Sequence, residues 1–123
     1  MKRLWKETKK GATKMEILKT IDQLDQLKAS ERTVFMFTTT WCGDCTYIKP
    51  FIPSIEAHFP DFTIVEVDRD QFMDFAQELG VMGIPSFVVY HQNEKVGDFI
   101  SADRKTQEEI EVFLTDINQK LSK

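Results

Sequence analysis

The sequence has 123 residues, of which 41% are hydrophobic, and a formal net charge of −4. This length predicts a single domain with its own hydrophobic core, and two cysteines are too few for a framework of structural disulfides. Because no stretch approaches the roughly 20 apolar residues of a membrane span and residues 1–6 lack the apolar region of a secretory signal, we expect a cytoplasmic protein without a membrane partner.

The start of the chain is basic, unlike the rest. Residues 1–14 carry six basic side chains and one acidic side chain, a net +5, so the remaining residues must carry −9 to reach −4. We interpret residues 1–12 as a basic N-terminal leader or edge element and residues 13–123 as the domain. Such a leader could contact an acidic partner or nucleic acid, although a solvated leader is the simpler interpretation. The acidic body argues against nucleic acid as the main partner.

The first two elements expected in the domain are a helix and a strand. Thr13 and Glu16 have the spacing of a capping box, and apolar residues then recur at helical spacing from Ile17 to Leu27. The β-branched and aromatic run from Thr33 to Thr38 is typical of a buried strand. We therefore expect a helix that begins near Thr13, followed by the central strand of a sheet.

A helix from about Gly43 to His58 should come next, and it contains two prolines. Pro50 removes one backbone hydrogen bond and kinks the helix, and Pro53 is an additional break, so the second half can begin as a new helix. The remaining elements expected are a strand at 62–67, a short helix at 72–79, a hairpin of strands at 86–90 and 95–100, and a last helix from Thr106 to Leu121.

This order of elements predicts the class of fold. Alternating strands and helices followed by a hairpin and a helix indicate an α/β fold, with a mixed central β-sheet flanked by helices on both faces. The hairpin should turn at Gln92 and Asn93, because asparagine tolerates a positive φ. Thr106 and Glu109 have capping-box spacing at the start of the last helix.

The two cysteines, Cys42 and Cys45, lie just after the predicted central strand. A helix places residues i and i+3 on one face, with Cβ atoms about 5–6 Å apart, which allows a disulfide. Its first turn also has unpaired N–H groups and the positive end of the helix dipole, which favour a thiolate. We expect Cys42 to be the exposed attacking thiol and Cys45, one turn further on, to be the shielded resolving thiol. A zinc site normally needs four ligands, and only two distant histidines accompany this pair, so no metal site is expected.

Two motifs resemble those of one family. Trp41-Cys42-Gly43-Asp44-Cys45 is similar to the thioredoxin active-site motif Trp-Cys-Gly-Pro-Cys, with Asp44 in place of proline, and Gly83-Ile84-Pro85-Ser86 is similar to the cis-proline turn of that family. The resemblance extends from about residue 17 to residue 121. It implies a thioredoxin fold and a thiol–disulfide oxidoreductase of protein disulfides, with the Cys42–Cys45 disulfide as the redox centre and no other cofactor. A thioredoxin-reductase-type enzyme or a small thiol would supply the electrons.

The resemblance also implies roles in binding the partner. Trp41 would form an apolar wall, and Gly43 would leave room for the partner's backbone to approach the first cysteine. Pro85 would lie beside the cysteines in a cis peptide bond, and the backbone of Ile84 would pair with an extended partner segment. The alternatives are a half-buried surface tryptophan and an ordinary trans-proline at the start of a strand.

Asp44 and Met36 are expected to tune the redox chemistry. The carboxylate of Asp44 would repel a thiolate at Cys42. Met36 occupies the position of the buried aspartate that is thought to accept the proton of the second thiol in the family, so water or Glu66 would have to replace it, or resolution would be slow. This departure leaves a second function open, a thioredoxin-fold binding or adaptor module with little redox turnover.

Overall fold

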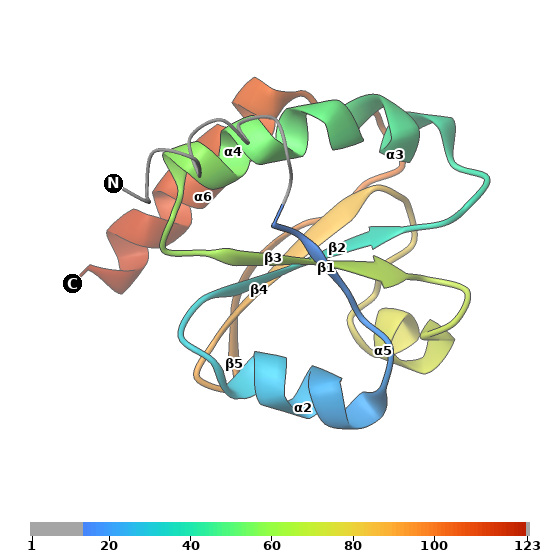
Figure 1. Ribbon diagram of the computed structural model, residues 1–123, viewed down its shortest axis with the longest axis horizontal. Helices are drawn as coiled ribbons and strands as arrows, with labels where there is room; N and C mark the ends of the chain where they lie inside the picture. Colours follow the sequence, from blue (N-terminus) through green and yellow to red (C-terminus); the bar gives the residue numbers. More distant parts are fainter. Residues whose placement is uncertain (1–13, 123) are drawn as a thin grey trace, which may run out of the picture.

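The computed structural model describes residues 14–122, which form a five-stranded sheet with helices on both faces (Figure 1). The strand order is β1-β3-β2-β4-β5, in which β1, β2 and β3 are parallel and β4 and β5 are antiparallel to their neighbours. This mixed sheet confirms the predicted fold class. The strands are β1 (Glu16–Ile17), β2 (Thr33–Thr38), β3 (Thr63–Asp68), β4 (Ser86–His91) and β5 (Glu94–Phe99).

The helices form two layers. In Figure 1, α3, α4 and α6 lie over one face of the sheet, and α2 and α5 lie over the other. Pro50 lies in a short 3-10 segment between α3 and α4, and Pro53 lies in the first turn of α4, so the predicted break near the prolines is confirmed. The helices are α2 (Ile21–Ala29), α3 (Gly43–Ile48), α4 (Ile52–His58), α5 (Met73–Glu78) and α6 (Gln107–Leu121), and the 3-10 segment η1 is Lys49–Phe51.

Strand β2 divides the hydrophobic core into two clusters because its side chains alternate between the faces of the sheet. Val34 and Met36 pack in the cluster that includes apolar residues of α4 and α6. Phe35 and Phe37 pack in the cluster that includes α2 and α5. All six residues of β2 are buried, as expected for a central strand covered on both faces. The strand therefore holds the segment that follows it firmly in place.

The chain before α2 differs from the prediction. Thr13 and the proposed leader at 1–12 lie outside the described residues, and Glu16 is not in a helix, because Glu16 and Ile17 form β1 beside β3. The helix begins instead after Thr20, whose side chain accepts a hydrogen bond from the backbone N–H of Gln23. The expected helix start near Thr13 was therefore wrong. A two-residue strand is too short to show alternation, so the capping-box spacing was misleading.

The second half of the chain follows the prediction closely. Gln92 and Asn93 have φ values of 50° and 71°, which form the expected two-residue turn between β4 and β5. The side chain of Thr106 caps α6, and Glu109 completes the capping box. Gly80 ends the α5 region with a φ of 73°. Local turn and cap chemistry therefore determined these boundaries.

Tyr90 places a titratable hydroxyl in the core. Its side chain is 6% exposed, and its ring packs against Phe35 and Phe75, with centroids 5.7 Å and 6.5 Å away. Burial raises the pKa of Tyr90 above 10.0; Glu78 adds to the increase and Lys95 opposes it. Because the pKa is higher in the folded state than in the unfolded state, this group contributes stability that is fully present below about pH 10 and is lost as the pH rises through the folded-state pKa.

We therefore expect Tyr90→Phe to resist alkaline unfolding better than the wild type. The two proteins should have similar melting temperatures at neutral pH and diverge by a few degrees between about pH 9 and pH 11, because phenylalanine cannot ionise. Thermal unfolding followed by circular dichroism over this pH range would test the expectation. If the melting temperatures of the two proteins fell in parallel as the pH rises, Tyr90 would not be the group that limits stability at alkaline pH.

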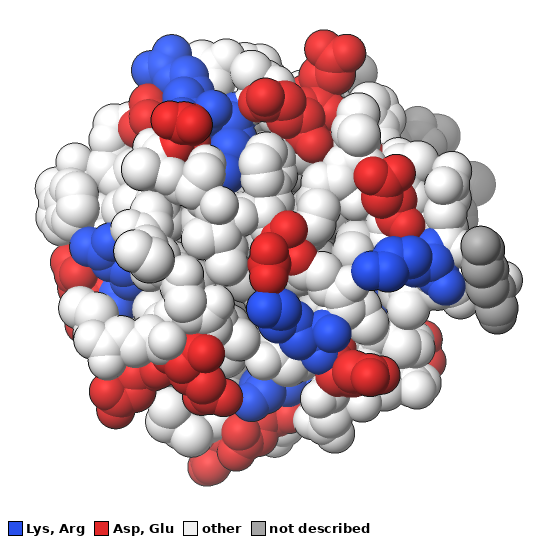
Figure 2. Space-filling view, turned by 180° about the vertical axis from the view of Figure 1, so that it is seen from behind, with Lys and Arg blue, Asp and Glu red and all other residues white. Residues whose placement is uncertain are grey.

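The surface has no extended patch of one charge on the face shown in Figure 2. Acidic and basic side chains are interspersed over that face. Within residues 14–122, no helix is long and apolar enough to cross a lipid bilayer. Recognition on the face in Figure 2 would therefore depend on individual side chains rather than on a broad field of one sign.

Candidate active site

The cysteines lie where β2 leads into α3. Cys42 is the N-cap of α3, with φ −90° and ψ 113°, and Cys45 lies in the first turn. Their Cα atoms are 5.3 Å apart, and a disulfide joins them. The backbone N–H of Cys45 donates to Sγ of Cys42 at 3.1 Å. The predicted geometry of a strand, a turn and a helix that begins at the cysteine pair is therefore confirmed.

The two cysteine residues differ in exposure less than expected. Cys42 is 7% exposed and Cys45 is 1% exposed, and both pack in the cluster formed with α2 and α5. Cys42 was expected to be an exposed residue, but it is largely covered because it packs in this core cluster. The expected order remains, since Cys42 is the more accessible of the two.

Trp41 and Gly43 flank the first cysteine. Trp41 is 64% exposed, and its indole N–H donates to Oδ2 of Asp70 at 3.2 Å. The guanidinium carbon of Arg69 lies 5.5 Å from the centroid of the indole ring. Apart from its chain neighbours and the backbone of its own helix, a Cβ atom on Gly43 would meet no atom within 4 Å. The surface beside Cys42 therefore combines an exposed aromatic ring with open space. The contacts of the Trp41 ring with Asp70 and Arg69 were not predicted from the sequence.

The segment before β4 brings a proline turn to the same region. The Ile84–Pro85 peptide bond is cis, as the resemblance to the thioredoxin family implied, and not the ordinary trans bond that was the alternative. Ile84 belongs to the same core cluster as the two cysteines. The hydroxyl of Ser86 donates to the carbonyl oxygen of Gly83 at 2.6 Å, which closes the turn. The fold thus brings together two motifs that are about 40 residues apart in the sequence.

Asp44 is engaged in an ion pair that the sequence did not reveal. Its Oδ1 accepts from Nε of Arg104 at 3.0 Å, and its side chain is 34% exposed. The guanidinium carbon of Arg104 lies 4.1 Å from the ring centroid of Tyr47. The charge of Asp44 is therefore partly balanced by Arg104. No local pattern in the sequence links these two residues, which are 60 positions apart.

Met36 lies opposite an acidic residue of the neighbouring strand. Met36 is fully buried, and its register partner on β3 is Glu66. The carboxylate of Glu66 accepts from the hydroxyl of Thr38 at 2.7 Å and lies 2.7 Å from Nζ of Lys49. The acidic group nearest to Met36 in the sheet is therefore on β3, and it already has two partners.

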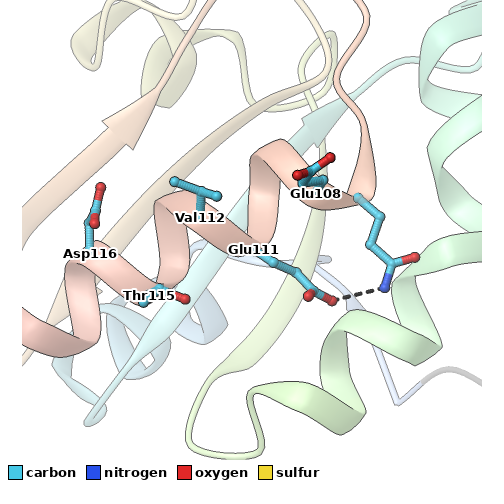
Figure 3. A pocket seen from close by; sticks show the side chains of 6 residues that line it. Glu108, Glu111, Val112, Thr115 and Asp116 are labelled. Atoms are coloured by element: carbon cyan, nitrogen blue, oxygen red, sulfur yellow. Dashed lines mark hydrogen bonds between the residues drawn. The ribbon is translucent and has the colours of Figure 1, made fainter.

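The hollow on α6 shown in Figure 3 is separate from this site. It is lined by Gln107, Glu108, Glu111, Val112, Thr115 and Asp116. None of these residues was predicted to act in redox chemistry. Both histidines have surface hydrogen bonds, His58 with Glu111 and His91 with the carbonyl oxygen of Glu31. Among residues 14–122, no group of three or more His, Cys, Asp or Glu side chains could hold a metal ion.

A cystine that closes a single helical turn, with a backbone N–H directed at its first sulfur, is suited to reversible exchange with other disulfides. Together with the mixed sheet and the proline turn, it makes the protein a thiol–disulfide oxidoreductase of the thioredoxin-fold class. The Thioredoxin family model matches residues 7–116. The chain belongs to the thioredoxin family, so protein disulfide reductase activity and protein disulfide substrates follow from its membership.

Individual relatives agree with this assignment. A thioredoxin of Ophiophagus hannah is 40% identical over 80 residues, which cover 65% of this chain and 76% of the relative. Thioredoxin-2 of Schizosaccharomyces pombe, named as mitochondrial, is 32% identical over 85 residues, which cover 69% of this chain and 64% of the relative. The crystal structure of a Trypanosoma brucei brucei thioredoxin matches with a TM-score of 0.76 at 22% identity and covers 90% of this chain and 95% of that one, which supports the fold.

Proposed function

We propose that Cys42 is the attacking thiol and Cys45 the resolving thiol of this reductase. The observation that carries the assignment is the hydrogen bond from the N–H of Cys45 to Sγ of Cys42 at 3.1 Å. The same N–H can stabilise a thiolate at Cys42 after reduction, because a hydrogen bond to the charged form favours that form. Cys42 is also at the N-cap, where the helix dipole favours negative charge. Cys45 lies further along the first turn of α3 and is more deeply buried, at 1% exposed against 7% for Cys42.

The proposed reaction has two exchange steps. In the first, the Cys42 thiolate attacks one sulfur of the partner disulfide, a mixed disulfide forms, and the second partner sulfur leaves as a thiolate that takes up a proton. In the second, Cys45 loses its proton and attacks Sγ of Cys42, which restores the Cys42–Cys45 disulfide and releases the other partner thiol. The partner gains two electrons and the protein loses two.

The partner would bind across the surface formed by the two motifs. We propose that the exposed ring of Trp41 contacts the partner and that the open space beside Gly43 admits its backbone. The backbone of Ile84 would pair with an extended partner segment next to the cis-Pro85 turn, in the manner of strand addition. These roles are supported by the position of Ile84 in the same core cluster as both cysteines.

A donor must then reduce the disulfide. We propose a thioredoxin-reductase-type enzyme or a small thiol as the donor and the cytoplasm as the compartment. A chain with only two cysteines, both in the redox motif, is suited to a reducing compartment. Because one relative is named as mitochondrial, cell fractionation is the appropriate test of the compartment.

Reduction of insulin by dithiothreitol tests the proposed turnover. The protein should accelerate the precipitation of reduced insulin several-fold over dithiothreitol alone, because the Cys42–Cys45 couple would pass electrons from the small thiol to the protein disulfide. The competing hypothesis, a binding module with little turnover, is favoured by one observation, the apolar Met36 at the position expected for a buried acid. A rate equal to that of dithiothreitol alone would support the binding module.

A further inference from the structure

The loop between β5 and α6, residues 100–106, is packed directly against the proline turn. A Cβ atom on Gly83 would overlap the backbone of Ser101 and Ala102. The two backbones are therefore in contact, and there is no room for a side chain between them. Since Gly83 comes two residues before Pro85, this loop forms part of the wall of the exchange site.

A buried lysine fixes the shape of the loop. Lys105 is 1% exposed, and its Nζ donates to the carbonyl oxygen and the hydroxyl of Ser101 at 3.0 Å each and to the carbonyl oxygen of Asp103 at 2.9 Å. Burial lowers the pKa of Lys105, and the carboxylates of Asp103, Glu109 and Asp44 oppose that shift. Three acceptors satisfy the three N–H groups of the ammonium, so Lys105 has none left for a partner.

Arg104, the residue before Lys105, is exposed rather than buried. Its side chain is 55% exposed, its Nε donates to Oδ1 of Asp44 at 3.0 Å, and its guanidinium stacks 4.1 Å from the ring centroid of Tyr47. Within residues 14–122, its two terminal nitrogens have no hydrogen-bond partner. The guanidinium is therefore held in place from two sides while its outer edge remains free to donate.

Arg69, the other arginine beside the motif among residues 14–122, is less available. The side chain of Arg69 is only 21% exposed, and its guanidinium lies 3.7 Å from the carboxylate of Asp70 and over the ring of Trp41. Among residues 14–122, the motif Trp41–Cys45 contacts two guanidinium groups, that of Arg69 at Trp41 and that of Arg104 at Asp44, and Arg104 is the one that can reach a partner.

We propose that Arg104 is an anion-binding subsite of the exchange site, which binds the carboxylate of an acidic residue next to the partner's disulfide. The proposal rests on the function proposed above, because it requires the partner disulfide to approach Cys42 beside Asp44. The free edge of the guanidinium can donate two parallel hydrogen bonds to one carboxylate. Contact with Tyr47 and Asp44 restricts the side chain before binding, so less conformational entropy is lost when a carboxylate binds. The protein should therefore prefer disulfides that have an acidic neighbour.

The test compares two synthetic peptide disulfides that differ only in the residues next to the cysteine, glutamate in one and glutamine in the other. The wild type should reduce the glutamate peptide with a kcat/KM about fivefold higher, mainly through KM. Arg104→Gln should bring this ratio to about one. Arg104→Lys should keep part of the preference for the glutamate peptide, because lysine keeps the positive charge but cannot donate two parallel hydrogen bonds to one carboxylate. Arg32→Gln is the matched control, since it removes an arginine that contacts Asn118 at the other end of β2.

The ratio of kcat/KM for the glutamate peptide to kcat/KM for the glutamine peptide distinguishes a binding role of Arg104 from a purely structural one. Loss of Arg104 also frees the charge of Asp44. The effect of that charge on the reactivity of Cys42 is the same for both peptides and cancels in the ratio, but its repulsion of the glutamate peptide does not. The ratio is therefore also measured for Arg104→Gln in an Asp44→Asn background, in which this repulsion is absent and the ratio should still be about one. A wild-type ratio of one, or a ratio unchanged in Arg104→Gln, would overturn the subsite. If the wild type reduces neither peptide, the proposed function itself fails. Added salt should lower the wild-type ratio and leave that of Arg104→Gln in the Asp44→Asn background unchanged.

Discussion

Cys45→Ser should remain covalently bonded to its partners, whereas Cys42→Ser should capture none. The hydrogen bond that favours a thiolate at Cys42 comes from the backbone N–H of residue 45, so the serine substitution keeps it. The variant can therefore still attack a disulfide, but it has no second thiol to release the product. In Cys42→Ser the remaining thiol is 1% exposed in the native protein and lies inside the first turn of α3, where a partner disulfide cannot reach it.

The trapping experiment requires only oxidised insulin and non-reducing gels. Most of the Cys45→Ser protein should run as a higher-mass mixed disulfide, which dithiothreitol reduces. Cys42→Ser should give no more of this mixed disulfide than the double variant does. The double variant controls for non-covalent association. Equal trapping by the two single variants would show that both sulfurs are accessible and would overturn the assigned order of attack.

Much of the site could be predicted because its chemistry is local. The Cys42–Cys45 pair, the strand before it and the helix after it lie within about 25 residues, and each is specified by its own pattern. The cap at Thr106 and the turn at Gln92 and Asn93 were predictable for the same reason. Sequence patterns predict such features well because the residues that specify them are close together in the sequence.

Features that depend on distant contacts were not predictable. The ion pair between Asp44 and Arg104 joins residues 60 positions apart, and neither residue has a local pattern that points to the other. Strand β1 exists only because β3 is beside it, since two residues have no periodicity of their own. The covering of Cys42 likewise follows from packing in the core cluster around it.

Met36→Asp should lower the stability of the protein strongly, and more so at pH 7 than at pH 4. Met36 is 0% exposed, and its partner across the strands is the carboxylate-bearing Glu66. Burial and the neighbouring negative charge both raise the pKa of an aspartate introduced there, and buried acids shift by about 3–5 units. A folded-state pKa above the unfolded value of about 3.9 gives stability that is present below that value and is lost as the pH rises. At pH 7 a shift of about three units corresponds to a loss of roughly 4 kcal/mol.

The matched control for this substitution is Met36→Asn, which has nearly the same shape and no titratable group. Both variants lose the packing of the methionine side chain, so their difference in unfolding free energy isolates the ionisation. This difference should be close to zero at about pH 4 and grow toward pH 7. Urea unfolding at a series of pH values would measure it. A difference that does not depend on pH would show that the carboxyl at position 36 is hydrated or neutralised, for example by Lys49, which lies beside Glu66.

The same shift has a consequence for the resolving step. An aspartate whose pKa is near 7 is well matched to accept the proton of Cys45, because proton transfer is most efficient when the pKa of the base is close to the working pH. Met36 and Cys45 pack in different core clusters, so the new carboxyl would act on the Cys45 thiol through solvent rather than by direct contact. We therefore expect Met36→Asp to release the mixed disulfide at least about tenfold faster than Met36→Asn near pH 7, under conditions in which both variants are folded. Equal release rates would indicate that another group, such as Glu66, already accepts the proton in the wild type.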